Sequence, residues 1–313
     1  MPMTIIKRRI IAAILGFLFF SIASTASAQR LNKLIELFEN DEPAFGVLSF
    51  NYSLDNARSL STSGLDFVFI DMEHAPFDVE RLREFLLGMT NKRSLVEKGS
   101  LQPDVVPFVR IPAAGGAEEL ISQAKQVLDV GVFGIFFPAI HTREQAELAI
   151  RATRYPQYNG AADYEPTGLR GRNPSNAVWY WGIRDYHAKA DVWPLDPQGE
   201  LLAMMFIESV EGVENIDEII TVPGLGGIFI GPSDLSTSMG FASPAAPQVE
   251  EAIQRVLQAC LDNDVPCAIT TGAGSVQERV EQGFSFVTVG ADGGLNSGAA
   301  NALRLGREAA GRD

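Results

Sequence analysis

Eight short apolar runs, each followed by a stretch of helical character, dominate the chain from residue 44 onward. The runs are rich in β-branched and aromatic residues, and they are apolar throughout, as is typical of strands buried on both faces of a parallel sheet. Strands that alternate with helices indicate βαβ units, and eight units in about 250 residues predict a closed (β/α)8 TIM barrel, a single α/β domain. The expected strands are residues 44–50, 66–70, 105–109, 132–137, 201–207, 227–230, 266–270 and 284–289.

An open, doubly wound sheet is the alternative architecture for such a pattern. That fold usually carries a glycine-rich phosphate loop after its first strand, and residues 49–52 (Ser-Phe-Asn-Tyr) are not such a loop. Amphipathic helices are expected at residues 30–40, before the first strand, and at 294–313, after the last one. The closed barrel is therefore the predicted fold for residues 29–313.

One segment interrupts the regular spacing of strands and helices. Residues 155–196, between the fourth and fifth strands, are rich in proline, glycine and aromatic side chains. Long excursions of this kind are usually functional or interfacial. We interpret the segment as an insertion that forms a lid or a subunit contact, and not as a separate domain.

The first 28 residues have the layout of a secretory signal peptide. Lys7, Arg8 and Arg9 precede an apolar run at 10–23, and Ala26-Ser-Ala28 forms a cleavage pattern. The run is shorter than the roughly 20 residues of a membrane span, which predicts a periplasmic or secreted protein with no stable membrane insertion after cleavage. An uncleaved leader that anchors the protein is the alternative, and the export route stays open.

The charge of the chain excludes one class of partner. The formal net charge is −14, and removal of the leader takes away three basic residues and no acidic ones, which gives about −17. Such a surface repels phosphate backbones, so nucleic acid is a poor partner. An anionic substrate needs a local positive site in this protein.

The two cysteines have two interpretations. Cys260 falls on a helical stretch and Cys267 on the strand that follows it. Export permits a disulfide, but free cysteine also packs as a small buried hydrophobe. We favour two buried thiols over a disulfide.

Two acids mark a candidate metal site at the mouth of the barrel. In a (β/α)8 barrel the active site lies at the carboxyl ends of the strands. Glu208 and Asp234 follow the fifth and sixth strands at a spacing of one strand–helix unit. Two carboxylates without histidine or cysteine suit a hard cation such as Mg²⁺ or Mn²⁺, with Co²⁺ or Zn²⁺ as alternatives. The competing interpretation is a pair of helix N-caps.

The second and third strands supply further reactive groups. Arg110 follows the third strand and is suited to bind an oxyanion, and a structural salt bridge across the mouth is the alternative. His74 follows the second strand and has Asp71 and Glu73 as neighbours, which favours a role as a general base. His141 and His187 have weaker cases, and we assign them no role.

Four segments carry a resemblance to a known family. They are Asp66-Phe-Val-Phe-Ile-Asp-Met-Glu-His-Ala-Pro76, Val109-Arg-Ile-Pro112, Phe206-Ile-Glu-Ser209 and Gly227-Ile-Phe-Ile-Gly-Pro-Ser-Asp-Leu-Ser236. In order and position they resemble the signature segments of the HpcH/HpaI aldolases, which are class II metal-dependent pyruvate aldolases related to macrophomate synthase and the citrate lyase β subunit. The resemblance runs from about Phe45 to Gly293.

The resemblance implies a role for each matching residue. Glu208 and Asp234 correspond to the metal ligands, Arg110 to the group that stabilises an enolate, and His74 to the general base. Asp129 matches the position that pairs with that histidine, and the backbone at Gly231, Pro232 and Ser233 corresponds to the site of the pyruvate carboxylate. Family members are usually homo-hexamers, built as trimers of dimers in which a C-terminal helix packs on a neighbour.

The expected function is cleavage or formation of the C3–C4 bond of 4-hydroxy-2-oxo acids, giving pyruvate and an aldehyde. Decarboxylation of oxaloacetate at the same site is one alternative. An exported, non-catalytic binder of metal-chelated sugar acids is another, and it would not require His74. Phe206 departs from the glutamine that many relatives have two residues before the ligand glutamate. This difference, the loop after Arg110 and the insertion bear on the acceptor substrate.

Overall fold

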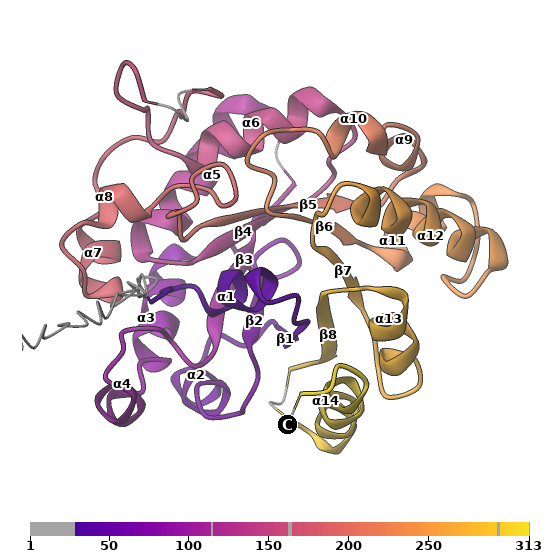
Figure 1. Ribbon diagram of the computed structural model, residues 1–313, viewed down its shortest axis with the longest axis horizontal. Coiled ribbons are helices and arrows are strands. Elements are labelled where there is room, and N and C mark those ends of the chain that lie inside the picture. The colour runs from indigo at the N-terminus through magenta and orange to yellow at the C-terminus, as the bar shows by residue number, and fades with distance from the viewer. Residues whose placement is uncertain (1–28, 114, 162–164, 293–294, 313) are drawn as a thin grey trace, which may run out of the picture.

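A computed structural model describes residues 29–113, 115–161, 165–292 and 295–312. The predicted leader, residues 1–28, lies outside the described residues. Eight parallel strands form a closed barrel in the order of the sequence, as predicted, and helices surround it (Figure 1). The strands are β1 (Ala44–Ser49), β2 (Phe67–Asp71), β3 (Val106–Arg110), β4 (Gly134–Phe137), β5 (Leu202–Ile207), β6 (Gly227–Ile230), β7 (Cys267–Thr270) and β8 (Phe286–Ala291).

The helices alternate with these strands and cover the outer face of the barrel. They are α1 (Lys33–Glu39), α2 (Leu54–Leu60), α3 (Val79–Gly88), α4 (Lys92–Lys98), α5 (Ala117–Val130), α6 (Arg143–Thr153), α7 (Ser175–Trp181), α8 (Tyr186–Lys189), α9 (Val210–Glu214), α10 (Ile216–Ile219), α11 (Pro232–Ser238), α12 (Pro247–Asp262), α13 (Val276–Gln282) and α14 (Ser297–Ala309). The helices predicted at 30–40 and 294–313 correspond to α1 and α14. α14 packs on α13, β8 and β1 of its own barrel. In the described part of the chain, no helix is long and apolar enough to cross a membrane.

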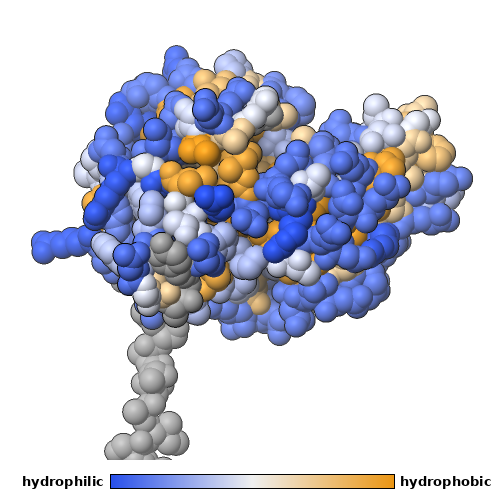
Figure 2. Space-filling view, turned by 90° about the horizontal axis from the view of Figure 1, so that it is seen from above, coloured by the Kyte–Doolittle hydropathy of each residue, from blue (hydrophilic) through white to orange (hydrophobic). Residues whose placement is uncertain are grey.

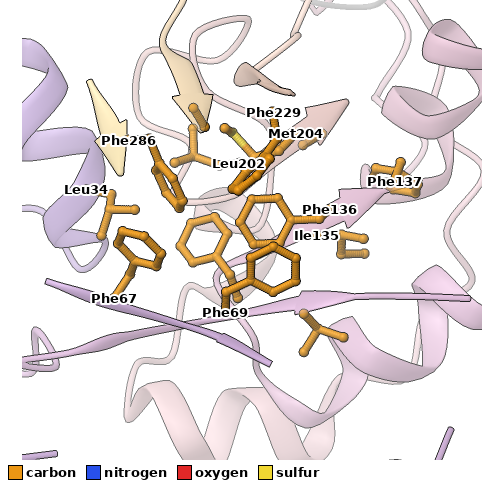
Figure 3. Packing of buried hydrophobic residues seen from close by; sticks show 14 of the residues in the cluster. Leu34, Phe67, Phe69, Ile135, Phe136, Phe137, Leu202, Met204, Phe229 and Phe286 are labelled. Carbon is orange, nitrogen blue, oxygen red and sulfur yellow. The ribbon is translucent and has the colours of Figure 1, made fainter. Parts of the chain in front are cut away.

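Phenylalanine rings fill the interior of the barrel. Phe69, Phe136, Phe206, Phe229 and Phe286 come from five different strands and contact one another, with ring centroids 4.2–6.2 Å apart. Figure 3 shows Phe69, Phe136, Phe229 and Phe286 together inside the barrel. Phe206 and Phe229 are stacked almost in parallel, at 4.4 Å and 6°. A barrel interior packed with side chains is a core and not a pore, so the mouth has a closed apolar floor.

Glycine makes room for these rings at one position on β4. A Cβ atom added to Gly134 would lie 2.7 Å from the carbonyl oxygen of Leu202 and closer still to the ring of Phe108. We therefore expect Gly134→Ala to lower the free energy of unfolding by about 1–3 kcal/mol, because overpacked cores must shift their side chains or backbone. Gly116→Ala is the matched control, since an added Cβ there meets no atom within 4 Å. Urea unfolding measures both, and equal stabilities would contradict the prediction.

The insertion between α6 and β5 is anchored near the amino ends of the strands. Trp181 of α7 stacks on Phe133 at 4.4 Å and donates to the carbonyl oxygen of Gly131 at 2.8 Å, just before β4 begins. The buried Arg170 binds Asp129 at 2.9 Å, near the end of α5. These contacts lie at the opposite end of the barrel from the mouth, so this part of the insertion does not form a lid over the mouth.

The two cysteines are free and buried, as favoured from the sequence. Cys260 lies on α12 and Cys267 begins β7. Burial, and then the neighbouring thiol of Cys260, raises the pKa of Cys267 well above its usual range. A thiol held in its neutral form is a poor nucleophile, so this pair serves packing in the described structure.

Candidate active site

A buried ion pair joins the carboxyl ends of β2 and β3. Asp71 and Arg110 are Cα partners in the sheet, and both lie within the strands, one residue beyond the predicted strand ends. The Nε and Nη2 atoms of Arg110 donate to the two carboxylate oxygens of Asp71, with the Nε contact at 3.1 Å. Asp71 is fully buried and Arg110 nearly so. Such a two-point contact fixes the plane of the guanidinium.

The aromatic floor supports the other side of that guanidinium. The central carbon of the Arg110 group lies 5.4 Å from the ring centroid of Phe69 and 5.3 Å from that of Phe206. A cation over aromatic faces is attracted by the negative faces of the rings. Phe206 thus holds Arg110 from below.

Glu208 lies at the end of β5, against the junction of β6 and α11. Its Oε1 atom accepts a hydrogen bond from the backbone N–H of Ala139 at 2.9 Å. Its Oε2 atom lies so close to Gly231 that a Cβ atom there would be only 2.8 Å away. Glycine at 231 therefore admits the carboxylate beside the turn that leads to Asp234, in the first turn of α11.

The two predicted metal ligands share one electrostatic environment. Burial raises the pKa of Glu208 above its ordinary value, and the charges of Asp234 and Glu73 raise it further. Carboxylates that repel each other in this way are stabilised by a shared cation. Within the described residues, no three or more His, Cys, Asp or Glu side chains are grouped to hold a metal ion. Two carboxylates with the other positions left to water or substrate still fit a hard divalent cation.

The backbone at 231–233 offers fewer hydrogen-bond donors than the resemblance implied. The N–H group of Gly231 donates to the carbonyl oxygen of Ile207 at 3.2 Å, and Pro232 has no N–H group. Ser233 begins the exposed edge of α11, where backbone N–H groups at a helix start lack helical partners. Of the three predicted residues, Ser233 is therefore the one suited to contact a carboxylate through its backbone.

His74 lies at the same mouth as the acids, and its side chain is 58% exposed. Its backbone N–H donates to Asp71 at 3.3 Å, and its Nε2 atom is 3.8 Å from Glu73. Asp129, in contrast, lies in the last turn of α5, which returns to the amino end of the barrel, and it pairs with Arg170 at 2.9 Å. The pair of His74 and Asp129 expected from the resemblance is thus not formed within one chain, because the two residues lie at opposite ends of the barrel.

Sequence reasoning gave no role to two residues that shape the site, Tyr52 and Ala139, and it named Glu73 only as a neighbour that supports His74. Tyr52 donates its hydroxyl to the backbone oxygen of Asp71. Ala139 adopts a left-handed backbone conformation (φ 53°) as it directs its N–H to Glu208. Glu73 contacts both Arg110 and His74. A signal existed only for Glu73, which sits between Asp71 and His74 in the sequence.

The remaining histidines and Asp292 have structural contacts. The Nδ1 atom of His141 lies 2.8 Å from the hydroxyl of Ser209, and Nε2 of His187 accepts from Arg172 at 2.9 Å. Burial and the nearby arginines lower the pKa of His187. Asp292 joins the end of β8 to that of β1 by accepting from Ser49 at 2.8 Å.

A closed parallel barrel with acids, an arginine and a histidine at the carboxyl end of its strands is a (β/α)8-barrel enzyme of the kind that works at this mouth. More narrowly, the chain belongs to the HpcH/HpaI aldolase/citrate lyase family, whose model matches residues 49–299. This confirms the resemblance seen in the sequence. The members of the family are carbon–carbon lyases, and that is the enzyme class of this chain.

Similar proteins agree with this assignment. A 5-keto-4-deoxy-D-glucarate aldolase from Escherichia coli (strain K12) is 33% identical over 239 residues, which cover 75% of this chain and 81% of the relative. A crystal structure of an HpcH/HpaI aldolase/citrate lyase family protein from Burkholderia cenocepacia J2315 is 30% identical, with a TM-score of 0.70, covering 89% of this chain and 97% of that one. Macrophomate synthase has the same fold at 24% identity and a TM-score of 0.63, with 90% of each chain covered.

Proposed function

We propose that this protein is a divalent-metal-dependent aldolase that cleaves or forms the C3–C4 bond of 4-hydroxy-2-oxo acids, with pyruvate and an aldehyde as the other partners. One observation carries the proposal: the Glu208 carboxylate lies against the turn that leads to Asp234, at the mouth that also holds the Arg110–Asp71 pair. This combines a place for a cation with a fixed oxyanion donor. The similarity to an aldolase that acts on a sugar-acid derivative supports the same substrate class.

Glu208 and Asp234 would hold the cation, with Mg²⁺ and Mn²⁺ as the best matches to two carboxylates. When bound, the cation supplies Lewis acidity to the 2-oxo group. Arg110 presents its remaining N–H groups from a rigid, nearly dry setting, where hydrogen bonds to a developing negative charge are strongest. Asp71 keeps the guanidinium in place. In cleavage, His74 accepts the proton of the substrate 4-hydroxyl group as the C3–C4 bond breaks to give an aldehyde and an enolate. The same proton then passes to C3 of the enolate to give pyruvate, and synthesis reverses both transfers.

A pyruvate-release assay on 4-hydroxy-2-oxo acids tests the proposal. We expect turnover with Mg²⁺ or Mn²⁺, its loss on treatment with EDTA, and its return when the metal is added back. The same assay with oxaloacetate separates aldol cleavage from decarboxylation. Full activity in the chelated enzyme would refute the role of the metal.

Metal binding should weaken at mildly acidic pH. The raised pKa of Glu208 means that its carboxylate takes up a proton at a higher pH than an exposed glutamate does. Protons and cations compete for the same oxygens. The affinity for the metal is therefore highest above this pKa, and it falls as the pH drops through it. Calorimetric titration with Mn²⁺ between about pH 8 and about pH 5 measures the effect, since an ordinary glutamate titrates near about 4.3. An affinity that stays constant over this range contradicts the prediction.

We also propose export to the periplasm or medium through residues 1–28. The mature chain would then begin at Gln29, and mass spectrometry of the protein from a periplasmic extract tests this. Recovery of the full-length chain from the membrane fraction would favour the uncleaved anchor instead.

We propose, third, that the protein forms a homo-oligomer. A hexamer is the form that the resemblance implies. Tyr158 and Trp179 of the insertion leave 80% and 70% of their surfaces exposed. Apolar residues also gather in a patch near the middle of the face shown in Figure 2, among largely hydrophilic ones. Because Asp129 is remote from His74 within one chain, a pairing between them needs a second copy. Light scattering of the purified protein gives the number of subunits.

A further inference from the structure

Glu73 occupies a bridging position that the proposed mechanism does not use. A single carboxylate oxygen, Oε2, lies 3.2 Å from Nη1 of Arg110 and 3.8 Å from Nε2 of His74. The Glu73 side chain is 17% exposed, between the 7% of Arg110 and the 58% of His74. It therefore links the most buried cation of the site to its most exposed candidate base.

The hydrogen-bonding geometry of Arg110 explains why Glu73 is held in place. A guanidinium presents its N–H groups in a rigid planar fork. Asp71 occupies Nε and Nη2, and Glu73 occupies the remaining nitrogen, Nη1. The backbone N–H of Glu73 also donates to Asp71 at 2.9 Å. Both the main chain and the side chain of Glu73 are thus tied to the same buried ion pair.

Within one chain, and among the described residues, the imidazole of His74 has no other acid beside it. Among the described residues, Glu73 is the acid whose carboxylate lies within ion-pair distance of that ring. The backbone of His74 is held by Asp71, but that bond does not fix the ring. The field of Asp234 also reaches Glu73 and, after burial, contributes to its raised pKa. The charge of Glu73 is therefore felt at the metal site, although its contacts are with Arg110 and His74.

We propose that Glu73 is a positioning residue that holds the His74 imidazole beside the Arg110 guanidinium, so that the base and the oxyanion donor act on one substrate at a fixed spacing. The inference rests on the proposed aldolase function and deepens it. Supporting carboxylates of this kind orient groups that they do not replace, and their loss typically costs about 10–100-fold in activity. Glu73 would contact neither the cation nor the substrate.

The test compares Glu73→Gln and Glu73→Asp with wild type and with Glu80→Gln. Glu80 is an exposed glutamate of α3 that pairs only with Arg83 in the described contacts, so it controls for the loss of a carboxylate near the mouth. For Glu73→Gln we expect kcat to fall by about 10–100-fold. KM for the 4-hydroxy-2-oxo acid and the Kd for Mn²⁺ should stay within about threefold of wild type, because only groups that touch ligand set them. Glu73→Asp keeps the charge on a shorter stem and should recover part of the loss in kcat.

Distinct outcomes overturn the inference. If wild type turns over and Glu73→Gln keeps kcat within about twofold, the role of Glu73 falls while the aldolase function stands. If the loss appears in the Mn²⁺ affinity or in KM, Glu73 is a ligand or binding residue and not a positioning one. If wild type releases no pyruvate from any 4-hydroxy-2-oxo acid, the proposed function falls, and the inference falls with it. Thermal unfolding of each variant confirms that the comparison is between folded proteins, and Glu73→Asp carries the test should the glutamine variant not fold.

Discussion

Glu208→Gln should lower kcat/KM by about 10³-fold or more, which corresponds to about 4 kcal/mol of transition-state stabilisation. The amide keeps the shape of the side chain and its contact with Ala139, but it removes one of the two charges available to a cation. Mn²⁺ binding should fall along with turnover. Calorimetry and the pyruvate-release assay measure the two effects on the same preparation.

The stability of this variant should move in the opposite direction. Burial, Asp234 and Glu73 all disfavour the ionised form of Glu208 in the folded protein. Removing that charge should therefore leave the metal-free protein at least as stable as wild type at neutral pH. Glu211→Gln, an exposed position on α9, is the matched control and should change neither property. A Glu208→Gln enzyme that binds Mn²⁺ and turns over normally would contradict the metal site.

Arg110→Met should abolish measurable turnover and also lower the free energy of unfolding by about 3–5 kcal/mol, since it leaves a buried carboxylate without its cation. Asp71, the partner, is fully buried, and the replaced guanidinium also rests on Phe69 and Phe206. Urea unfolding and steady-state kinetics measure the two losses.

Two further variants separate the ion pair from the chemistry. Arg83→Met breaks an exposed pair with Glu80, and surface pairs of this kind are worth about 0–1 kcal/mol. The double variant Asp71→Leu/Arg110→Met replaces both charges by apolar groups, so it should regain much of the stability but none of the activity. Wild-type stability in the single Arg110→Met variant would show that the pair contributes little to the fold.

The barrel was predictable from the sequence because its strands are buried on both faces and therefore read as unbroken apolar runs. Three predicted strands ended early, the second and third by one residue and the eighth by two. Asp71 and Arg110 looked like the start of loops, yet they continue β2 and β3 because each neutralises the other across the sheet. A single sequence does not show which charged residues will be paired, so these two strand ends were placed one residue too early.

The residues of the site divide in the same way. Glu208 and Asp234 could be brought together from their spacing, because one strand–helix unit returns the chain to the same end of the barrel. Tyr52 and Ala139 gave no signal, since they act through a hydroxyl contact with a backbone oxygen and through a backbone N–H. The sequence also offered no way to predict the residue that pairs with Asp129. Arg170 lies in an insertion whose path no periodic pattern describes.

The stacked phenylalanines beneath Arg110 also determine the route by which protons exchange between the site and the solvent. Rings from five strands fill the interior of the barrel. Protons that exchange at a reacting carbon must therefore enter and leave at the mouth of the barrel. The rate of deuterium uptake by pyruvate should accordingly fall when a bound aldehyde obstructs the mouth. Substitutions at the amino end of the barrel should leave this rate unchanged. The packed aromatic rings thus leave the site open to solvent at one end only.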